Sequence, residues 1–402
     1  MNGTVVYVVS LFPCWSETFI VREIEALLRR GVDVRIVSLK APSEAMVHPQ
    51  AERLMDRVVC AEMRGGTWRA FRTKLRHPWI VARAVGIAVA ALWRHPVALL
   101  KTLATFQRSL ALVDWLKDVD PRHIHAHWAT YASSGAWLMA QVVGKPFSYT
   151  THAHDLFLED HFIARKIRDS VFTVTISRFN VELIRKRYGE AVAAKVRVVH
   201  CGVDLAEFDA AGGAGAPTRL LSVGRLDPIK GFDVLIDACA RLRDAGHEFH
   251  CEIIGEGGLR PALEAQIVQL GLQGRVTLPG ARPQHVVRAA MSQAGLFIMP
   301  SVVAADGNMD GIPVALMEAM AMKRAVVSTY VSGIPEIIED GITGLLVNPG
   351  DATALASALE RLLLEPALRE TLGIGARACV SRDFDADVEG GKIHEMISAG
   401  SS

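Results

Sequence analysis

The stretch Asp310-Gly-Ile-Pro-Val-Ala-Leu-Met-Glu318-Ala-Met-Ala321 places a loop carboxylate in front of an apolar run that contains a second acid. Proline is favoured in the first turn of a helix, because its fixed φ suits the helix and its missing N–H is not needed there, so a helix is expected to start at Pro313. Glu318 then falls inside the apolar residues 314–322. A buried carboxylate needs a polar partner, since an unpaired charge in a core is costly. The stretch predicts either a capped helix with one tolerated acid or a helix that presents an acid to a ligand.

Two further motifs follow this helix, Ser332-Gly-Ile-Pro-Glu336 and Asp340-Gly-Ile-Thr-Gly-Leu-Leu-Val347. In this order, the three motifs resemble the carboxy-terminal half of the retaining glycosyltransferases of family 4. The resemblance implies that an acid, and a Glu after seven intervening residues, contact a nucleotide-sugar donor; the first acid here is Asp, where Glu is usual. The donor-binding residues that it implies in this stretch are Asp310, Gly311, Ile312, Pro313 and Glu318.

The motif Gly224-Arg225-Leu-Asp-Pro-Ile-Lys230-Gly231 stands between an expected strand at residues 219–223 and an expected helix. A diphosphate leaving group gains negative charge as its sugar departs. Arg225 can bind phosphate oxygens through two parallel N–H bonds, Lys230 adds a point charge, and the helix N-terminus adds its dipole. Such a cluster can replace the divalent metal that other transferases use, so neither a metal nor another cofactor is expected.

A glycine-rich turn, Gly255-Glu256-Gly-Gly258, follows the next expected strand at residues 250–254. One interpretation is that its backbone approaches the nucleotide, which adds Gly255 and Glu256 to the donor-binding residues. The other is a plain tight turn without a ligand.

Length and composition indicate a globular protein of two α/β domains. The chain has 402 residues, half of them hydrophobic, which is enough for two domains of roughly 200 residues with a core each. Short β-rich runs alternate with helical patterns, as in doubly wound parallel sheets. The net charge of +1 argues against a nucleic-acid partner. The six cysteines include no C-x-x-C pair, so neither a zinc knuckle nor a disulfide framework is expected, and a reducing cytoplasm is predicted.

The family resemblance implies the GT-B architecture, in which two doubly wound Rossmann-like domains face each other across a cleft. Residues 1–208 are then the acceptor-binding domain, and their start at residues 4–9 is interpreted as a buried strand rather than a secretory signal. A run of Ala and Gly predicts a linker at residues 209–217. Residues 218–384 are expected to bind the nucleotide sugar, and residues 385–402 to form a terminal helix that returns to the first domain.

Two segments of the first half are candidates for the acceptor side. Ser16-Glu17-Thr18-Phe19 is predicted either to cap a helix, with Ser16 as N-cap and Glu17 in the first turn, or to be an acceptor-side loop, since similar sequences of exopolysaccharide assembly carry it. Thr151-His152-Ala-His154-Asp155 resembles the T-H-x-x-D segment of the family, which implies that His152 lies near the donor sugar and that Asp155 orients it. The residues thus assigned to the acceptor side are Ser16, Glu17, Thr18 and Asp155.

The histidines allow a different hypothesis. His123, His125 and His127 alternate along one β-rich stretch, and His152 and His154 follow another. Imidazoles on alternate strand positions face one side, as metal ligands do, so a metal-dependent hydrolase is one rival prediction. A nucleotide-sugar epimerase of the same fold is another. The sequence does not arrange acids around these histidines as a metal site requires, which favours packing for the first three.

Residues 63–113 differ from the rest of the chain. They contain nine Lys or Arg and no acid, with Trp68, Trp79 and Trp93 among them, and two prolines divide them into short helices. No apolar run here reaches the ~20 residues that cross a bilayer. The segment is predicted either to lie on an anionic membrane surface or to pack on its own domain with a solvated basic face.

Taken with these motifs, the resemblance implies a retaining hexosyltransferase. Its expected reaction moves a hexose from a UDP- or GDP-sugar to a saccharide acceptor, which is expected to be lipid-linked. The expected pathway is bacterial surface or exopolysaccharide synthesis. The expected location is the cytoplasm or the inner face of the membrane. The catalytic residues expected for this reaction are His152, Asp310, Arg225 and Lys230. Glu318 is expected to accept hydrogen bonds from the ribose hydroxyls. No nucleophilic carboxylate stands out in the first half, which suits a front-face mechanism assisted by the leaving phosphate.

Overall fold

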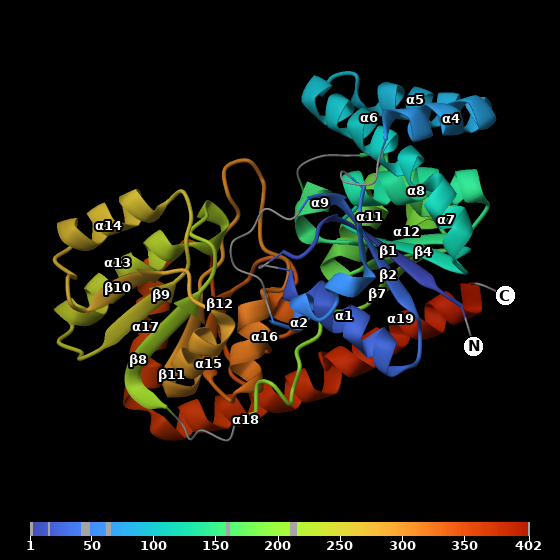
Figure 1. Cartoon of the computed structure of the whole chain (residues 1–402). Helices are drawn as coiled ribbons and strands as arrows, with labels where there is room; N and C mark the ends of the chain where they lie inside the picture. Colours follow the sequence, from blue (N-terminus) through green and yellow to red (C-terminus); the bar gives the residue numbers. More distant parts are fainter. Residues whose placement is uncertain are drawn as a thin grey trace. The chain divides into compact units, whose positions relative to one another are not determined.

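The structure is a computed structural model that describes residues 3–14, 17–41, 49–61, 66–157, 161–209 and 215–400 (Figure 1). Contacts along the chain define two compact units: Met1–His200 together with Asp387–Ser402, and Cys201–Ala386. Most of the predicted linker at 209–217 lies outside the described residues, as does Ser16.

The first unit ends at His200 instead of at the predicted residue 208. The residues that follow pack on the second unit, where Phe208 is buried in an apolar core. The Arg377 guanidinium donates a 2.9 Å hydrogen bond to the Phe208 carbonyl oxygen, and Val203 forms a β-bridge with Asp385. The boundary is set by this packing, which the composition of the chain does not reveal.

The first unit is built on a seven-stranded parallel sheet in the order β3-β2-β1-β4-β5-β6-β7. The central strands β4 and β5 are buried at every position, as in a sheet covered on both faces. The strand order reverses between β1 and β4, so the switch point of this Rossmann-type sheet lies there. The strands are β1 Val5–Leu11, β2 Val34–Lys40, β3 Val58–Cys60, β4 His123–His127, β5 Phe147–Thr151, β6 Phe172–Thr175 and β7 Val196–Val198.

Helices connect these strands. In the first of them, α1, Ile20, Ile24 and Leu27 lie on the face that packs into the core, as their helical spacing predicts. Besides the three helices of the basic segment, the helical elements of this unit are α1 Thr18–Arg29, α2 Pro49–Glu52, η1 Met55–Arg57, α7 Val113–Val119, α8 Tyr131–Val143, α9 Ala153–Phe157, α10 Ile163–Asp169, α11 Arg178–Tyr188, α12 Glu190–Ala193 and α19 Ala386–Gly400.

The basic segment forms α4 Thr67–Arg76, α5 Pro78–Leu92 and α6 Pro96–Ala111, with a proline at the start of α5 and of α6. Their buried residues are mostly small or apolar, and α5 and α6 pack on α8 (Figure 1). Among the described residues, no single helix is long and apolar enough to cross a membrane; α4 and α5 meet those criteria only as a pair, bent by 105°.

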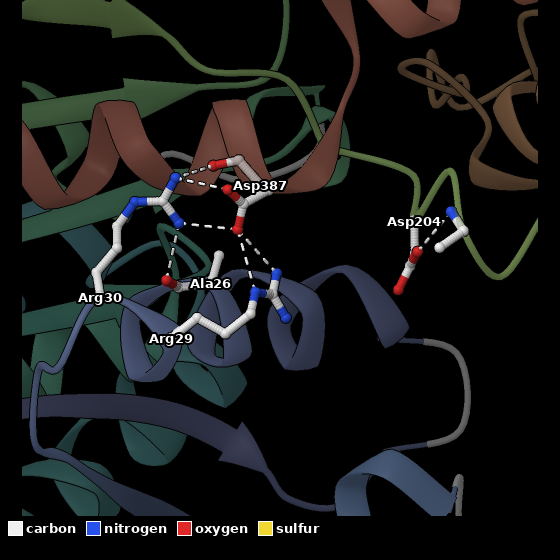
Figure 2. Close-up of polar contacts among 6 residues, drawn as sticks. Ala26, Arg29, Arg30, Asp204 and Asp387 are labelled. Carbon is white, nitrogen blue, oxygen red and sulfur yellow. Dashed lines mark hydrogen bonds and ion pairs between the residues drawn. The ribbon is translucent and has the colours of Figure 1, made fainter.

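The carboxy-terminal helix α19 lies against α1, and both belong to the first unit (Figure 2). The Arg30 guanidinium donates to the two carboxylate oxygens of Asp387 at 2.9 and 2.8 Å and to its main-chain oxygen at 2.7 Å. Arg29 Nε donates to the same carboxylate at 3.1 Å. The helices approach closely at Gly390, where a Cβ would lie 2.4 Å from the Ala26 Cβ.

The second unit has six parallel strands in the order β10-β9-β8-β11-β12-β13, with its switch point between β8 and β11. Its strands are β8 Ala216–Val223, β9 His250–Ile254, β10 Val276–Gly280, β11 Ala294–Met299, β12 Ala325–Thr329 and β13 Leu345–Val347. Its helical elements are η2 Pro228–Lys230, α13 Phe232–Asp244, α14 Arg260–Gln269, α15 Gln284–Gln293, α16 Val314–Ala321, η3 Ile334–Glu336, α17 Ala352–Leu364 and α18 Pro366–Asp383.

Candidate functional site

Each unit places candidate residues at the carboxyl ends of its strands, beside its switch point. In the second unit, Lys230 follows β8 and Asp310 follows β11, and these two strands are neighbours. In the first unit, His127 ends β4 and His152 follows β5. Ligands of open α/β sheets bind at such positions, so each unit has the geometry of a ligand site.

An enclosed ion pair forms the centre of the second-unit site. Lys230 Nζ lies 2.8 Å from Asp310 Oδ1, and the Ser301 hydroxyl donates to the other carboxylate oxygen at 2.7 Å. The Lys230 and Asp310 side chains are only 14 % and 11 % exposed, so little water screens their attraction. Two residues that the sequence assigned to the donor separately therefore contact each other. Ser301 was missed by the sequence analysis.

The loop after β8 brings Lys230 to this position. Asp227 accepts a hydrogen bond from the Ile229 N–H at 3.3 Å and starts the short turn η2. Gly231 ends the turn with φ +61°, and a Cβ there would lie 2.1 Å from the Pro300 carbonyl oxygen. Only glycine fits such a position, so the backbone of the loop after β8 can pack closely against the residue that follows β11.

Arg225 lies outside this cluster. Its side chain is 69 % exposed, and its guanidinium pairs with Asp227 at 3.6 Å. An exposed pair at this distance contributes little to stability. The structure thus joins Lys230 and Asp310 but not Arg225, whose contact with a diphosphate stays a prediction.

Helix α16 begins one residue later than predicted. The Pro313 carbonyl oxygen accepts from the N–H groups of Leu316 and Met317, so Pro313 occupies the N-cap position with extended backbone and not the first turn. Glu318 is buried on this helix, at 8 % exposure. Ile312 is buried in an apolar core, so its side chain serves packing.

The glycine turn after β9 is shaped by the protein's own backbone. A Cβ at Gly255 would lie 1.8 Å from the Gly224 carbonyl oxygen, and one at Gly257 would lie 2.3 Å from that of Leu226. The Glu256 carboxylate accepts two hydrogen bonds from Arg260, at 2.7 and 2.9 Å. These contacts account for Gly255 and Glu256 without a ligand.

Replacing Gly255 with alanine should destabilise the second unit by about 1–3 kcal/mol or more, because the added Cβ would overlap the Gly224 carbonyl group. Gly258→Ala in the same turn is a matched control, since a Cβ at Gly258 has nothing within 4 Å. Urea unfolding followed by circular dichroism measures both variants. Equal stabilities would contradict the close packing of the two loops.

In the first unit, His152 is fixed by its backbone and by two aromatic rings. The Asp155 carboxylate accepts hydrogen bonds from the N–H groups of Ala129, at 2.7 Å, and of His152, at 3.1 Å. The rings of Trp128 and Phe19 lie 4.5 and 4.8 Å from the His152 ring, between centroids. Trp128 has φ 77°, which is rare for a bulky residue and persists only where the surrounding structure enforces it. Asp155 thus ties the ends of β4 and β5 together.

The other acceptor-side candidates lie at the start of α1. This helix begins at Thr18 with Glu17 at the N-cap position, whereas the sequence predicted Ser16 as the cap and Glu17 in the first turn. Ser16 itself is not among the described residues. Phe19 is the next residue of the helix and contacts His152, so the start of α1 and His152 belong to one site.

A chain of hydrogen bonds runs from His152 into the first unit. His152 Nε2 lies 3.3 Å from His127 Nδ1, and His127 Nε2 lies 3.1 Å from Glu23 Oε1. The Tyr7 hydroxyl donates to the same Glu23 oxygen at 2.7 Å. Sequence analysis missed Glu23 and Tyr7. The signal for Glu23 was an acid on the apolar face of α1, where a carboxylate needs partners.

Burial and neighbouring charges fix the protonation of this chain. Burial raises the pKa of Glu23, but attraction to His127 and a hydrogen bond from it, with smaller effects of His125 and Tyr7, outweigh burial and hold the pKa at about 2. Burial lowers the pKa of His152 well below its usual value, and the proximity of His127 lowers it further. At neutral pH, Glu23 is therefore a carboxylate and His152 a neutral imidazole.

The two earlier histidines of β4 bond to side chains of β5. Ser148 Oγ lies 2.6 Å from His123 Nε2 and 2.7 Å from His125 Nδ1, and Thr150 Oγ1 lies 3.1 Å from His125 Nε2. Burial lowers the pKa of each of these histidines to about 3. Both are neutral and bonded within the sheet, which is typical of packed histidines.

Among the described residues, Glu23, His125 and His127 have potential metal-ligand atoms within 4.8 Å of one another. In the structure, hydrogen bonds already engage these atoms: the His127 ring and the Tyr7 hydroxyl bind the Glu23 carboxylate. The rival hydrolase hypothesis also used His154, whose side chain lies outside the described part of the chain. The hydrogen bonds explain the three side chains without a metal.

Two Rossmann-type units, each with candidate residues at its switch point, define the GT-B fold. Anabaena HepE, solved in complex with UDP, has a similar fold: the TM-score is 0.72 at 18 % identity, and the match covers 99 % of this chain and 100 % of HepE. At this identity the likeness establishes the fold alone.

Sequence comparison identifies the family. Residues 16–207 match Glycosyltransferase Family 4, and residues 217–365 match Glycosyl transferases group 1. The amylovoran biosynthesis glycosyltransferase AmsK of Erwinia amylovora is 40 % identical over 207 residues, 51 % of each chain. The putative colanic acid biosynthesis glycosyltransferase WcaL of Escherichia coli K12 is 39 % identical over 213 residues, also 51 % of each chain.

The chain belongs to the family 4 glycosyltransferases, as its motifs predicted. The matched region spans about half the length of the curated relatives AmsK and WcaL. These comparisons do not favour the rival hydrolase or epimerase.

Proposed function

We propose that this protein is a retaining hexosyltransferase of exopolysaccharide synthesis, which transfers a hexose from a nucleotide-diphosphate sugar to a saccharide acceptor. Membership of the family and the names of AmsK and WcaL support glycosyl transfer in such a pathway. The observation that carries the proposal is the enclosed Lys230–Asp310 pair at the switch point of the second unit.

Lys230 is proposed to hold the diphosphate of the donor. Its ammonium group has three donors, so it can keep its bond to Asp310 and still bind phosphate oxygens. As the bond between the anomeric carbon and the phosphate oxygen breaks, this cation stabilises the charge that collects on the leaving group. Arg225, exposed on the same loop, supplies a second cation, and no metal cofactor is required.

The sugar and the nucleoside are proposed to contact the carboxylates of this unit. Asp310 is held by Lys230 and Ser301 and accepts hydrogen bonds from sugar hydroxyls. Glu318 accepts them from the ribose.

Retention of the anomeric configuration is proposed because the two carboxylates around His152 are already engaged. Asp155 accepts two backbone N–H bonds, and Glu23 lies behind His127. Neither is presented as a nucleophile. In the front-face reaction, the acceptor oxygen bonds to the anomeric carbon on the face that the phosphate leaves, and a phosphate oxygen takes the acceptor proton.

A donor panel tests this function. Thermal unfolding is measured with UDP, GDP and their hexose conjugates, in the presence of EDTA, and the stabilising donor is then incubated with saccharide acceptors. We expect one nucleotide to raise Tm without metal, and nuclear magnetic resonance to show a product with the donor's anomeric configuration. Stabilisation by zinc alone in a parallel series without EDTA, or an inverted product, would contradict the proposal.

We propose that α4, α5 and α6 lie on an anionic membrane and that the acceptor is lipid-linked. The exposed fraction is 70 % for Trp68, 86 % for Trp79 and 68 % for Trp93, which is unusual for a monomer surface. Interfacial tryptophan beside Lys and Arg is typical of segments that bind anionic lipid. The exposed basic side chains of these helices and their connections include Arg69, Arg76, Arg83, Arg94 and Lys101.

Replacing the three tryptophans with serine should weaken binding to phosphatidylglycerol vesicles at least about tenfold, because their apolar area and interfacial anchoring are lost. Flotation assays measure binding, with pure phosphatidylcholine vesicles as the uncharged comparison. Three exposed apolar residues of the second unit serve as matched control substitutions: Val268, Leu364 and Ile374. Unchanged binding of the tryptophan variant, or equal binding to both vesicles, would contradict membrane docking.

A further inference from the structure

Glu23 is the end of the hydrogen-bond chain behind His152, and the proposed reaction assigns it no role. Its side chain is 14 % exposed and lies on α1, while His127 ends β4. The Tyr7 hydroxyl and the His127 ring both bind the same oxygen of Glu23. An acid held in this way is separated from His152 by one imidazole ring.

The charge of Glu23 determines which nitrogen of His127 carries the proton. A carboxylate only accepts hydrogen bonds, so His127 must donate to it from Nε2. An imidazole that carries its single proton on Nε2 is an acceptor at Nδ1. The neighbouring His152 Nε2, 3.3 Å away, must donate to it. The proton of neutral His152 is thereby placed on Nε2.

This leaves Nδ1 of His152 as an acceptor. Among the described residues, that nitrogen has no hydrogen-bond partner, and the rings of Trp128 and Phe19 lie beside the His152 ring at tilted angles. The ring is therefore held in place, with one acceptor available for a ligand. A hydroxyl group is the natural donor, and hexoses carry several.

We propose that Glu23 is a positioning residue which, through His127, keeps the proton of His152 on Nε2, so that His152 Nδ1 accepts a hydrogen bond from a hydroxyl of the sugar substrate. The inference rests on the proposed function for the identity of the ligand. The tautomer itself is a property of the protein alone. An orienting acid behind a functional imidazole acts in this way in other enzymes, because it selects one tautomer and one ring orientation.

Glu23→Gln is the decisive variant, because it keeps the shape of the side chain and removes its charge. Glutamine can donate as well as accept, so His127 no longer has to carry its proton on Nε2. Tyr7→Phe is the matched control, since it removes the other hydrogen bond to the same oxygen and leaves the Glu23 charge in place. Long-range proton–nitrogen spectra of protein labelled at histidine nitrogens report the tautomers, with His127 and His152 assigned by substitution.

We expect wild-type and Tyr7→Phe protein to show His152 protonated at Nε2, and Glu23→Gln to show a changed proton distribution on both rings. With the donor found in the panel, Glu23→Gln should lower kcat about 10- to 100-fold, with KM for the donor changed less than about threefold. Tyr7→Phe should stay within about threefold of wild-type kcat.

Unchanged His152 resonances in Glu23→Gln would overturn the inference, and so would a wild-type His152 with its proton on Nδ1. A kcat loss that Tyr7→Phe reproduces in full would also overturn it, since such a loss would reflect general disturbance of the buried cluster. If wild-type protein transfers no sugar, the proposed function fails, but the spectra still decide whether Glu23 sets the tautomer.

Discussion

Lys230→Ala should lower kcat/KM for sugar transfer by roughly 100- to 1,000-fold, because the variant loses the enclosed cation that stabilises the leaving diphosphate. The nucleotide that stabilises the wild-type protein should no longer raise Tm. Arg241→Ala is the matched control: this arginine is exposed on α13 of the same unit, so its loss changes the net charge equally without touching the cluster. Initial rates at low donor concentration and thermal unfolding with nucleotide measure both effects.

A second variant separates a role in binding from a role in folding. Lys230→Ala leaves the Asp310 carboxylate largely buried without its cation, which by itself destabilises the unit. Adding Asp310→Asn removes that uncompensated charge while Ser301 can still bind the side chain. The double variant should therefore regain Tm but not activity. Recovery of activity in the double variant would show that Lys230 only neutralises Asp310.

The sequence predicted the positions of this cluster but not its contacts. Lys230 and Asp310 could each be assigned to a loop after a buried strand, because strand and helix patterns alternate clearly in this half. Their direct bond joins residues 80 positions apart, and the bond from Ser301 depends on how the loop before Asp310 folds back. Neither follows from local patterns, since the first arises where β8 and β11 become neighbours and the second from the path of the loop after β11.

In the first unit, the β-rich stretch before His152 correctly predicted a strand there, but neither this pattern nor the family resemblance gave an account of what surrounds His152. Glu23 is recognisable only as an acid among the apolar positions of a helix, and its partner His127 lies 104 positions further along the chain. The alternation of histidines in β4 allowed ligands or packing, and the lack of acids around them favoured packing. The structure supports packing for His123 and His125, because both form hydrogen bonds with Ser148 or Thr150 of β5. In the sequence, these two partners are ordinary strand residues.

Acidification from pH 6.5 to pH 5 should lower the free energy of unfolding of the first unit by at least about 3 kcal/mol. Burial is the main cause of the lowered pKa of His123, His125 and His152, to about 3 for the first two. In the unfolded chain these groups titrate near ~6.5. The unfolded state therefore binds more protons below that pH, and the stabilisation present above it is lost as the pH falls toward the folded pKa values. His123 and His125 each contribute about 1.6 kcal/mol over this interval, and His152 acts in the same direction.

Glu23 acts in the same direction at lower pH. Its folded pKa of about 2 lies below the ~4.3 of an unfolded glutamate. Its stabilising contribution is therefore complete above pH ~4.3 and declines as the pH falls further. The loss between pH 6.5 and 5 is thus due to the histidines, and the carboxylate adds to it only in stronger acid.

Tryptophan fluorescence can follow this unit selectively, because all seven tryptophans lie in residues 15–137. Urea titrations at several pH values give the free energy of unfolding, and its slope against pH gives the number of protons taken up. His123→Gln should reduce the loss by about 1.6 kcal/mol, since one buried titrating group is removed while a side chain able to bond Ser148 remains. A free energy that stays constant from pH 6.5 to 5 would mean that these histidines are hydrated or charged in the folded protein. Such a result would also contradict the neutral His152 on which the positioning by Glu23 depends.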